Sequence, residues 1–264
     1  MSRPSFTVGV ASTFPPREDG IATFTRDLVH GVCGAYGGIG ARIAAITDPG
    51  SHYAYPAQVR WEIAQDDPES YAEAGRAFAR ARVAVVSLQH EFGLWGAPGY
   101  LAEPFDAYDC APAFLDVLDR PVVTTLHTVL PQPRADIRAA IRLLCQRSAV
   151  TVVMVGVGAK ILAEDYGVDP AHLVVIPHGV PEVRPVDTER AKRPLRLSGH
   201  TVICTFGLLS RTKGIEHAIQ ALPEVVARHP DVLYLIMGET HPQVRLSWPI
   251  SPSVRSCWWL EIFW

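Results

Sequence analysis

Continuous apolar runs alternate with segments of helical spacing along the first part of this 264-residue chain. The runs are rich in Val, Ile and Leu and lack a period of two, which is typical of strands buried on both faces. Such strands belong to parallel sheets that helices cover on either side. The alternation therefore predicts an α/β fold whose N-terminal domain is a doubly wound, Rossmann-like parallel sheet.

The expected elements follow one another with short connections. Strands are predicted over residues 6–11, 42–47, 83–88, 122–126, 150–155 and 173–176. Helices are predicted around Phe24, Leu28 and Val32 and over residues 69–82, 105–118, 136–147 and 158–166. Because each helix lies between two strands, right-handed βαβ crossovers are the expected connections.

A change of composition marks the end of this first domain. Residues 181–200 combine prolines with mixed charges, which is typical of a linker. A second α/β unit then begins with a strand over 202–206, a helix over 215–228 and a strand over 232–237. The predicted organisation consists of an N-terminal domain 1–180, a linker 181–200, a partial second domain 201–243 and a tail 244–264.

The tail departs from the alternating pattern. It holds Trp248, Trp258, Trp259 and Trp264 and shows no helical period. Two parallel strands with one helix cannot bury both faces of a sheet. We therefore expect an incomplete second domain, truncated or frame-shifted near Val244, with a Trp-rich docking tail as the competing interpretation.

The composition excludes several classes of protein. A net charge of −3 does not favour nucleic acid as a partner, and no apolar run reaches the length of a membrane span. The five cysteines are dispersed without C-x-x-C spacing, and the ten histidines form no H-E-x-x-H pair. We expect reduced thiols, no metal site and a cytoplasmic protein, with peripheral membrane contact left open.

The segment from Thr205 to Glu216 is the most informative for function. Arg211 and Lys213 lie just before the helix that begins near Ile215. A helix N-terminus already carries a partial positive charge, so two cations there become favourable when an anion binds. A phosphate group of a nucleotide is the expected anion, and a solvated surface loop is the alternative.

Several polar residues follow strands of the first domain. Gly20 lies in the loop after the first strand, His90 and Glu91 follow the third, His127 the fourth and His178 the sixth. Ligands of doubly wound sheets bind at the carboxyl ends of the strands. Each histidine taken singly has a structural interpretation, whereas their equivalent positions predict a polar, functional cleft.

Five segments in this order resemble the family 4 glycosyltransferases of the GT-B fold. They are the loop with Pro15, Pro16, Arg17 and Gly20–Ala22, the histidine motif Thr125–Thr128, the exit segment Val175–Val180, the phosphate loop Gly207–Gly214 and the segment Glu239–Pro242. The resemblance extends from about Phe6 to about Val244. It implies an N-terminal acceptor-side domain and a C-terminal domain that binds a nucleotide-sugar.

The resemblance also implies a reaction and a set of site residues. A sugar would pass from a nucleotide-sugar to an acceptor hydroxyl with retention of configuration, and no metal or other cofactor would be required. Arg211, Lys213 and Gly20 would bind the donor phosphates, and His127 would be the catalytic residue beneath the sugar. His90, Glu91 and His178 are acceptor or sugar-binding candidates, while the acceptor itself (a sugar, a lipid-linked glycan or a small molecule) stays undetermined.

Two departures from the family pattern stand out. Glu18 and Asp19 precede a single Gly20 where the family usually has paired glycines, and their carboxylates would repel a diphosphate. The family's E-x7-E motif is missing from its place late in the second domain, and Glu261 has no partner at that spacing. A non-catalytic module that binds a nucleotide-sugar or sugar phosphate is therefore the alternative function, and an epimerase of the same architecture is a third.

Overall fold

The structure is a computed structural model that describes residues 6–96, 109–210, 213–240 and 259–263, the last of these as backbone only. Its contacts divide the chain into two compact units, Met1–Gly179 and Val180–Trp264. Each unit has its own sheet and its own buried residues, so each is described by itself.

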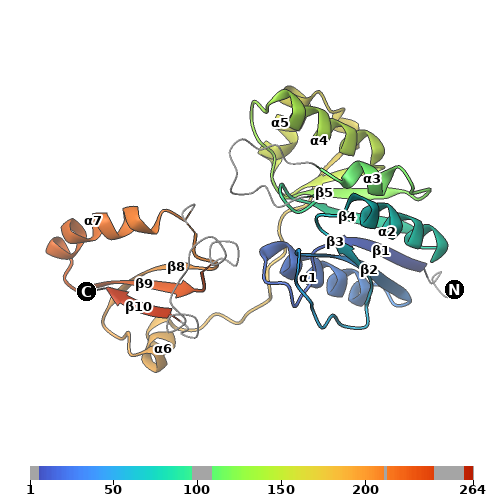
Figure 1. The fold of residues 1–264 in the computed structure, drawn as a ribbon. Helices are drawn as coiled ribbons and strands as arrows, with labels where there is room; N and C mark the ends of the chain where they lie inside the picture. The colour runs from blue at the N-terminus through green and yellow to red at the C-terminus, as the bar shows by residue number, and fades with distance from the viewer. Residues whose placement is uncertain (1–5, 97–108, 211–212, 241–258, 264) are drawn as a thin grey trace. The chain divides into compact units, whose positions relative to one another are not determined.

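The first unit is built on seven parallel strands in the order β3-β2-β1-β4-β5-β6-β7 (Figure 1). The strands are β1 Phe6–Ser12, β2 Ile39–Thr47, β3 Val59–Ala64, β4 Val85–His90, β5 Val122–Leu126, β6 Val150–Val153 and β7 Leu173–Val175. The direction of winding reverses between β1 and β4. Ligands of doubly wound sheets bind at this switch point, at the carboxyl edge of the strands. The predicted α/β, GT-B-like sheet is confirmed.

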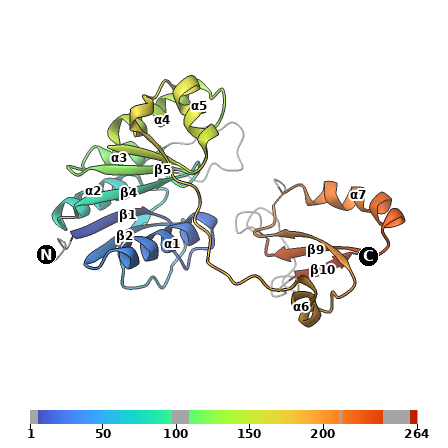
Figure 2. The ribbon, with the colours of Figure 1, turned by 180° about the vertical axis from the view of Figure 1, so that it is seen from behind.

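Helices cover both faces of this sheet (Figure 2). They are α1 Gly20–Ala35, α2 Pro68–Arg80, α3 Ala111–Leu115, α4 Ala135–Arg147 and α5 Gly156–Tyr166. Successive strand residues point to opposite faces. Val10 of β1 therefore packs in the cluster with Val29 of α1, whereas Ala11 belongs to the larger cluster with Phe78 of α2.

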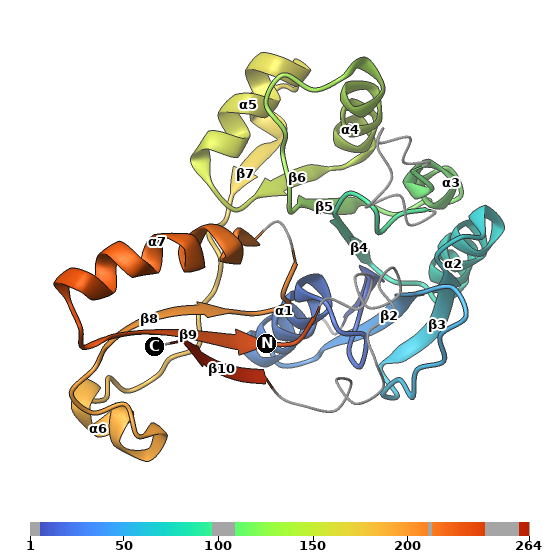
Figure 3. The ribbon, with the colours of Figure 1, turned by 60° about the vertical axis from the view of Figure 1, so that its left-hand side comes forward.

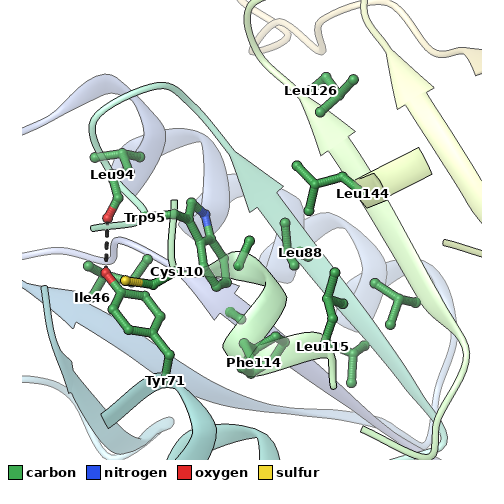
Figure 4. Packing of buried hydrophobic residues seen from close by; sticks show 14 of the residues in the cluster. Ile46, Tyr71, Leu88, Leu94, Trp95, Cys110, Phe114, Leu115, Leu126 and Leu144 are labelled. Atoms are coloured by element: carbon green, nitrogen blue, oxygen red, sulfur yellow. Dashed lines mark hydrogen bonds between the residues drawn. The ribbon is translucent and has the colours of Figure 1, made fainter. Parts of the chain in front are cut away.

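The larger cluster forms the main core of the unit (Figure 4). Trp95 lies between Tyr71 and Phe114, with ring centroids 5.5 Å from each. The Tyr71 hydroxyl donates to the carbonyls of Gln65 at 3.0 Å and Leu94 at 3.3 Å. These bonds satisfy a fully buried hydroxyl and join the segments after β3 and β4, so the core supports the carboxyl edge of the sheet.

Two elements of the first unit differ from the prediction. Strand β3 was not predicted, because an edge strand with Arg60, Trp61 and Glu62 in its middle lacks the continuous apolar run of the central strands. The helix predicted over 105–118 is the short α3, Ala111–Leu115, and residues 105–108 lie outside the described residues. The remaining predicted strands and helices of this unit occur, with ends shifted by a few residues.

The second unit contains a three-stranded sheet in the order β10-β9-β8 (Figure 3). Its elements are α6 Thr188–Lys192, the 3-10 helix Arg193–Leu195, β8 Thr201–Phe206, α7 Ile215–Arg228, β9 Val232–Gly238 and β10 Trp259–Phe263. Helices α6 and α7 lie on opposite sides of this sheet. The predicted strand–helix–strand unit is present, and the linker contains a short helix that its composition did not predict.

Part of the predicted tail forms strand β10. Trp259–Phe263 pairs with β9 in an antiparallel ladder, so the sheet has three strands instead of two parallel ones. An antiparallel strand needs no helical crossover to reach its place, which is why the alternating pattern did not show it. The rest of the predicted tail, residues 244–258 and 264, lies outside the described residues.

Burial in the second unit is concentrated on β9. Residues 232–236 are buried, and Leu233 and Leu235 form a small cluster with Leu197. By contrast, α7 has no buried residue, and Phe206 at the end of β8 is 75% exposed. The strand and helix that flank the predicted phosphate loop therefore have little of their apolar surface covered.

Candidate functional site

The loop after β1 is organised by one buried arginine. Arg17 is 7% exposed, and its guanidinium pairs with Asp19 at 3.0 Å and with Asp48 at 2.7 Å. The same group donates to the carbonyl oxygen of Ile46 at 2.9 Å and to the side chain of Gln65 at 3.1 Å. The guanidinium thus joins the loop to the carboxyl ends of β2 and β3, and its charge is balanced where it is buried.

Asp19 is the N-cap of α1. Its Oδ1 accepts from the backbone N–H of Ala22 at 2.6 Å and from the Thr13 hydroxyl at 2.9 Å. Burial raises the pKa of Asp19, while the Ala22 N–H and Arg17 oppose that rise. Arg17 neutralises the Asp19 carboxylate and the helix uses it as a cap, while the predicted repulsion of a diphosphate stays a prediction.

Gly20, the first residue of α1, is exposed, and a Cβ there would have no atom within 4 Å. The surrounding protein therefore leaves the backbone at this point open to a ligand. Glu18 is exposed as well, so its carboxylate stays solvated near the loop. The predicted contact of Gly20 with donor phosphates stays a prediction.

His127 lies directly after β5 and is held by neighbours on two sides. Its Nε2 lies 2.9 Å from Oε1 of Gln89, the last but one residue of β4. The ring of Phe24, from the first turns of α1, meets it edge to face with centroids 4.8 Å apart. Because β4 and β5 are neighbouring parallel strands, the two ends that carry Gln89 and His127 lie side by side.

Phe24 also connects His127 to His178. The Phe24 and His178 rings are edge to face with centroids 5.6 Å apart, and His178 is exposed. Segments after β1, β5 and β7 therefore meet at one place on the carboxyl edge. The predicted placement of His127 and His178 on one edge of the sheet agrees with these contacts.

His127 is held in its neutral form. Burial, with smaller contributions from the nearby His178 and His90, lowers the pKa of His127 to about 4. At neutral pH the imidazole is therefore uncharged. An uncharged ring can position a sugar through a hydrogen bond but has no positive charge to offer a leaving phosphate.

His90 and Glu91, although adjacent in sequence, have different surroundings. His90 is 2% exposed, and its Nε2 lies 3.0 Å from a carboxylate oxygen of Asp109. A direct acceptor contact by His90 therefore does not fit this structure. Glu91 is half-buried and accepts from the Thr128 hydroxyl at 2.7 Å, which links the segments after β4 and β5 at the same edge.

The predicted phosphate loop lies in the second unit, and Arg211 and Thr212 fall outside the described residues. Lys213 is exposed, and Gly214 caps α7 without a side-chain hydrogen bond to the helix. No side chain of the cap residue thus covers the first N–H groups of α7. A phosphate at this helix end would find free backbone donors beside a cation.

A close backbone contact closes this end of the second sheet. The N–H of Gly207 donates to the carbonyl of Met237 at 2.9 Å. A Cβ on Gly238 would lie 1.8 Å from the carbonyl oxygen of Gly207, and Gly238 has a φ of 153°. Only glycine at 238 allows this approach, which fixes where the loop leaves β8.

Two glutamates on α7 have the spacing of an E-x7-E motif. Glu216 and Glu224 are eight residues apart, are both exposed, and lie in the helix that directly follows the phosphate loop. This is not the place late in the second domain where the family carries its motif. They therefore do not supply the missing motif.

Neither a metal centre nor a membrane span is evident in the part of the chain that the structure describes. Its His, Cys, Asp and Glu side chains include no group of three or more that suits a metal ion. None of its helices combines the length and the apolar character that crossing a membrane requires.

Comparison with known protein families shows to which family this chain belongs. The model of Glycosyltransferase Family 4 matches residues 20–184, which is more than half of the chain. The chain belongs to glycosyltransferase family 4. No curated protein matches it.

Solved structures share the fold of this family 4 chain at low sequence identity. A glycosyltransferase from Rickettsia africae has a TM-score of 0.54 at 13% identity, over 92% of this chain and 71% of that one. Anabaena HepE in complex with UDP and glucose has a TM-score of 0.59 at 13% identity, over 92% of this chain and 63% of that one. The S. aureus MnaA complex with UDP has a TM-score of 0.53 at 9% identity, over 91% and 65%.

These relatives are longer than this chain. It spans 71% of the Rickettsia protein and less than two thirds of the other two. At such low identity they show the GT-B fold alone, and the family assignment rests on the family match.

Sequence reasoning missed three residues of this edge, namely Arg17, Phe24 and Gln89. In the sequence Arg17 is one residue of a longer motif, and Phe24 is one apolar position of a helix. Gln89 had one available signal, since it is a polar residue at the end of an apolar strand. The sequence alone could not show which residue each of the three contacts, because each contact joins segments that are far apart in the sequence.

Proposed function

We propose that this family 4 chain transfers a sugar from a nucleotide-sugar to an acceptor hydroxyl with retention of configuration. The observation that carries the proposal is the cluster of His127, Phe24 and His178 at the carboxyl edge of the first sheet. It lies where doubly wound sheets bind ligands, in a chain whose family is that of glycosyltransferases.

The chemical roles follow from charge and placement. Arg211, Lys213 and the open N-terminus of α7 would stabilise the negative charge that develops on the diphosphate as the glycosidic bond breaks. With two cations in that role, the reaction is proposed to need no metal ion. Neutral His127 would orient the sugar, and Glu91 and His178 are the proposed contacts to the acceptor.

The proposal extends to partners and location. A nucleotide-sugar is the donor, and because HepE and MnaA are each described in complex with UDP, UDP-glucose is the first donor to test. The acceptor is proposed to be a sugar, a lipid-linked glycan or a small molecule, and not a nucleic acid. A cytoplasmic location, with room for peripheral membrane contact, completes the proposal.

The test is donor binding and turnover by the purified chain. UDP-glucose and a panel of other nucleotide-sugars would be titrated by calorimetry and assayed for sugar transfer to a mixture of glycoside acceptors. Each charge-assisted contact contributes about 1.5–3 kcal/mol, so Lys213→Ala should weaken donor binding roughly 10- to 100-fold. Lys160→Ala, an exposed cation on α5, is the matched control and should leave binding unchanged.

The outcomes separate the two candidate functions. Transfer with the product anomer matching the donor supports the proposal, and product of the opposite anomer overturns the retaining mechanism. Binding that depends on Lys213 without any transfer supports the non-catalytic nucleotide-sugar module. Absence of binding to every donor contradicts both.

A further inference from the structure

Gln89 is a fully buried polar residue with every side-chain atom engaged. Its exposed fraction is 0%, and it stands at the end of β4 facing the end of β5. The amide nitrogen lies 2.9 Å from the Ser87 hydroxyl and 3.4 Å from the Thr125 hydroxyl, while the amide oxygen lies 2.9 Å from His127 Nε2. In this arrangement the amide nitrogen donates to the two hydroxyls and the amide oxygen faces the histidine.

The orientation of this amide determines the tautomer of His127. A carbonyl oxygen only accepts hydrogen bonds, so the Nε2 atom opposite it must carry the proton. A neutral imidazole has a single ring proton, and burial keeps the ring neutral by lowering its pKa to about 4. The lone pair therefore lies on Nδ1.

Nδ1 of His127 is the ring atom left for a ligand. No described residue forms a hydrogen bond with this atom. Because it is also absent from the buried polar atoms that lack a partner, it must be accessible to solvent. Phe24 fixes the plane of the ring from the side by its edge-to-face contact. The nitrogen that reaches the surface is thus held in place and accepts a hydrogen bond instead of donating one.

We propose that Gln89 is a positioning residue that holds His127 as the Nε2-protonated tautomer, so that Nδ1 accepts a hydrogen bond from a hydroxyl group of the substrate. For the identity of that substrate the inference rests on the proposed function. Its consequence is that His127 recognises a sugar hydroxyl and does not protonate the leaving diphosphate. A sugar with that hydroxyl replaced by hydrogen should bind less well.

The tautomer can be measured without substrate. Long-range proton–nitrogen spectra of the full chain labelled with nitrogen-15 histidine, at neutral pH, report which ring nitrogen of each histidine carries the proton. The His127 signal is assigned by its loss in His127→Gln. In the unmodified protein it should be protonated at Nε2, and in Gln89→Met it should shift to a mixture of both tautomers.

Two further variants separate positioning from a general structural effect. Gln89→Glu retains an oxygen acceptor and should keep the Nε2 proton, which rescues the tautomer that Gln89→Met loses. Gln146→Met, an exposed glutamine on α4, should leave every histidine signal unchanged. A His127 protonated at Nδ1 in the unmodified protein, or a tautomer that Gln89→Met does not alter, would overturn the inference.

The measurement is independent of turnover. A correct tautomer in a protein that transfers no sugar would contradict the proposed function and leave the role of Gln89 standing. A different tautomer in a protein that transfers sugar would contradict the role of Gln89 and leave the proposed function standing.

Discussion

Arg17 is the residue on which the loop before α1 depends. Its guanidinium contacts two carboxylates, Asp19 and Asp48, and it is almost completely buried. Removing one partner of a buried ion pair leaves the other charge without compensation, which costs far more than the pair contributes on balance. The loop before α1 and the ends of β2 and β3 are therefore held together by the Arg17 guanidinium.

Replacing this arginine should destabilise the first unit. We expect Arg17→Met to lower the free energy of unfolding by about 3–5 kcal/mol, because both carboxylates stay partly buried. Arg26→Met is the control: Arg26 pairs with Asp27 at the surface, and the expected loss is at most about 1 kcal/mol. Urea denaturation followed by circular dichroism measures both, and equal losses would contradict the role given to Arg17.

His127 makes the stability of the first unit depend on pH. Its pKa is about 4 in the folded protein against an ordinary value of 6.5, with burial as the main cause. Between these values the unfolded chain binds more protons, so stability is present above pH 6.5 and falls as the pH drops towards 4. A shift of this size corresponds to about 3 kcal/mol at most.

Comparison with His127→Gln isolates this effect, because glutamine does not titrate. The free energy of unfolding of the unmodified protein should fall relative to that of the variant as the pH is lowered through this window. A difference between the two proteins that stays constant with pH would show that His127 is not held neutral by burial.

At the scale of elements, α2 and α3 pack together through a glycine. A Cβ on Gly75 of α2 would lie 2.5 Å from the Val117 side chain and 2.7 Å from the Phe114 carbonyl oxygen. A backbone atom cannot yield as a flexible side chain can, so the approach of the two helices requires glycine here. The pair of helices in turn covers the core beneath β4.

Two substitutions of glycine by alanine should therefore have opposite signs. Gly75→Ala is expected to destabilise by about 1–3 kcal/mol, because the methyl group overpacks the contact with α3. Gly31→Ala in α1 has no atom within 4 Å of the new Cβ and should stabilise by about 0.5–1 kcal/mol through helix propensity. Thermal unfolding of both variants tests this, and a stabilising Gly75→Ala would show that the helices are not in this contact.

At the scale of the whole molecule, the two units differ in how much of their apolar surface is buried. The first unit has a core cluster that joins α2, α3, α4 and α5 to the sheet. The second buries mainly β9 and leaves α7 without a buried residue. Because buried apolar area provides most of the stabilising free energy, the first unit should hold most of the stability of the chain.

Much of the fold follows from local sequence. Continuous apolar runs such as 122–126 indicated central strands, and the helices between them gave the doubly wound topology. The edge strand β3 was not predicted, since its residues alternate in burial and do not form a continuous apolar run. Strand β10 was missed because an antiparallel pairing leaves no crossover in the sequence.

The sequence by itself determined which strand ends carry polar residues, and so placed His127 and His178 on one edge of the sheet. Only the tertiary structure decided how they are used: Gln89 faces the imidazole of His127, Phe24 touches both rings, and burial keeps His127 neutral. The physical reason is that periodicity reports which face of an element is buried, whereas a hydrogen bond or a pKa depends on atoms that meet only after distant segments have packed together.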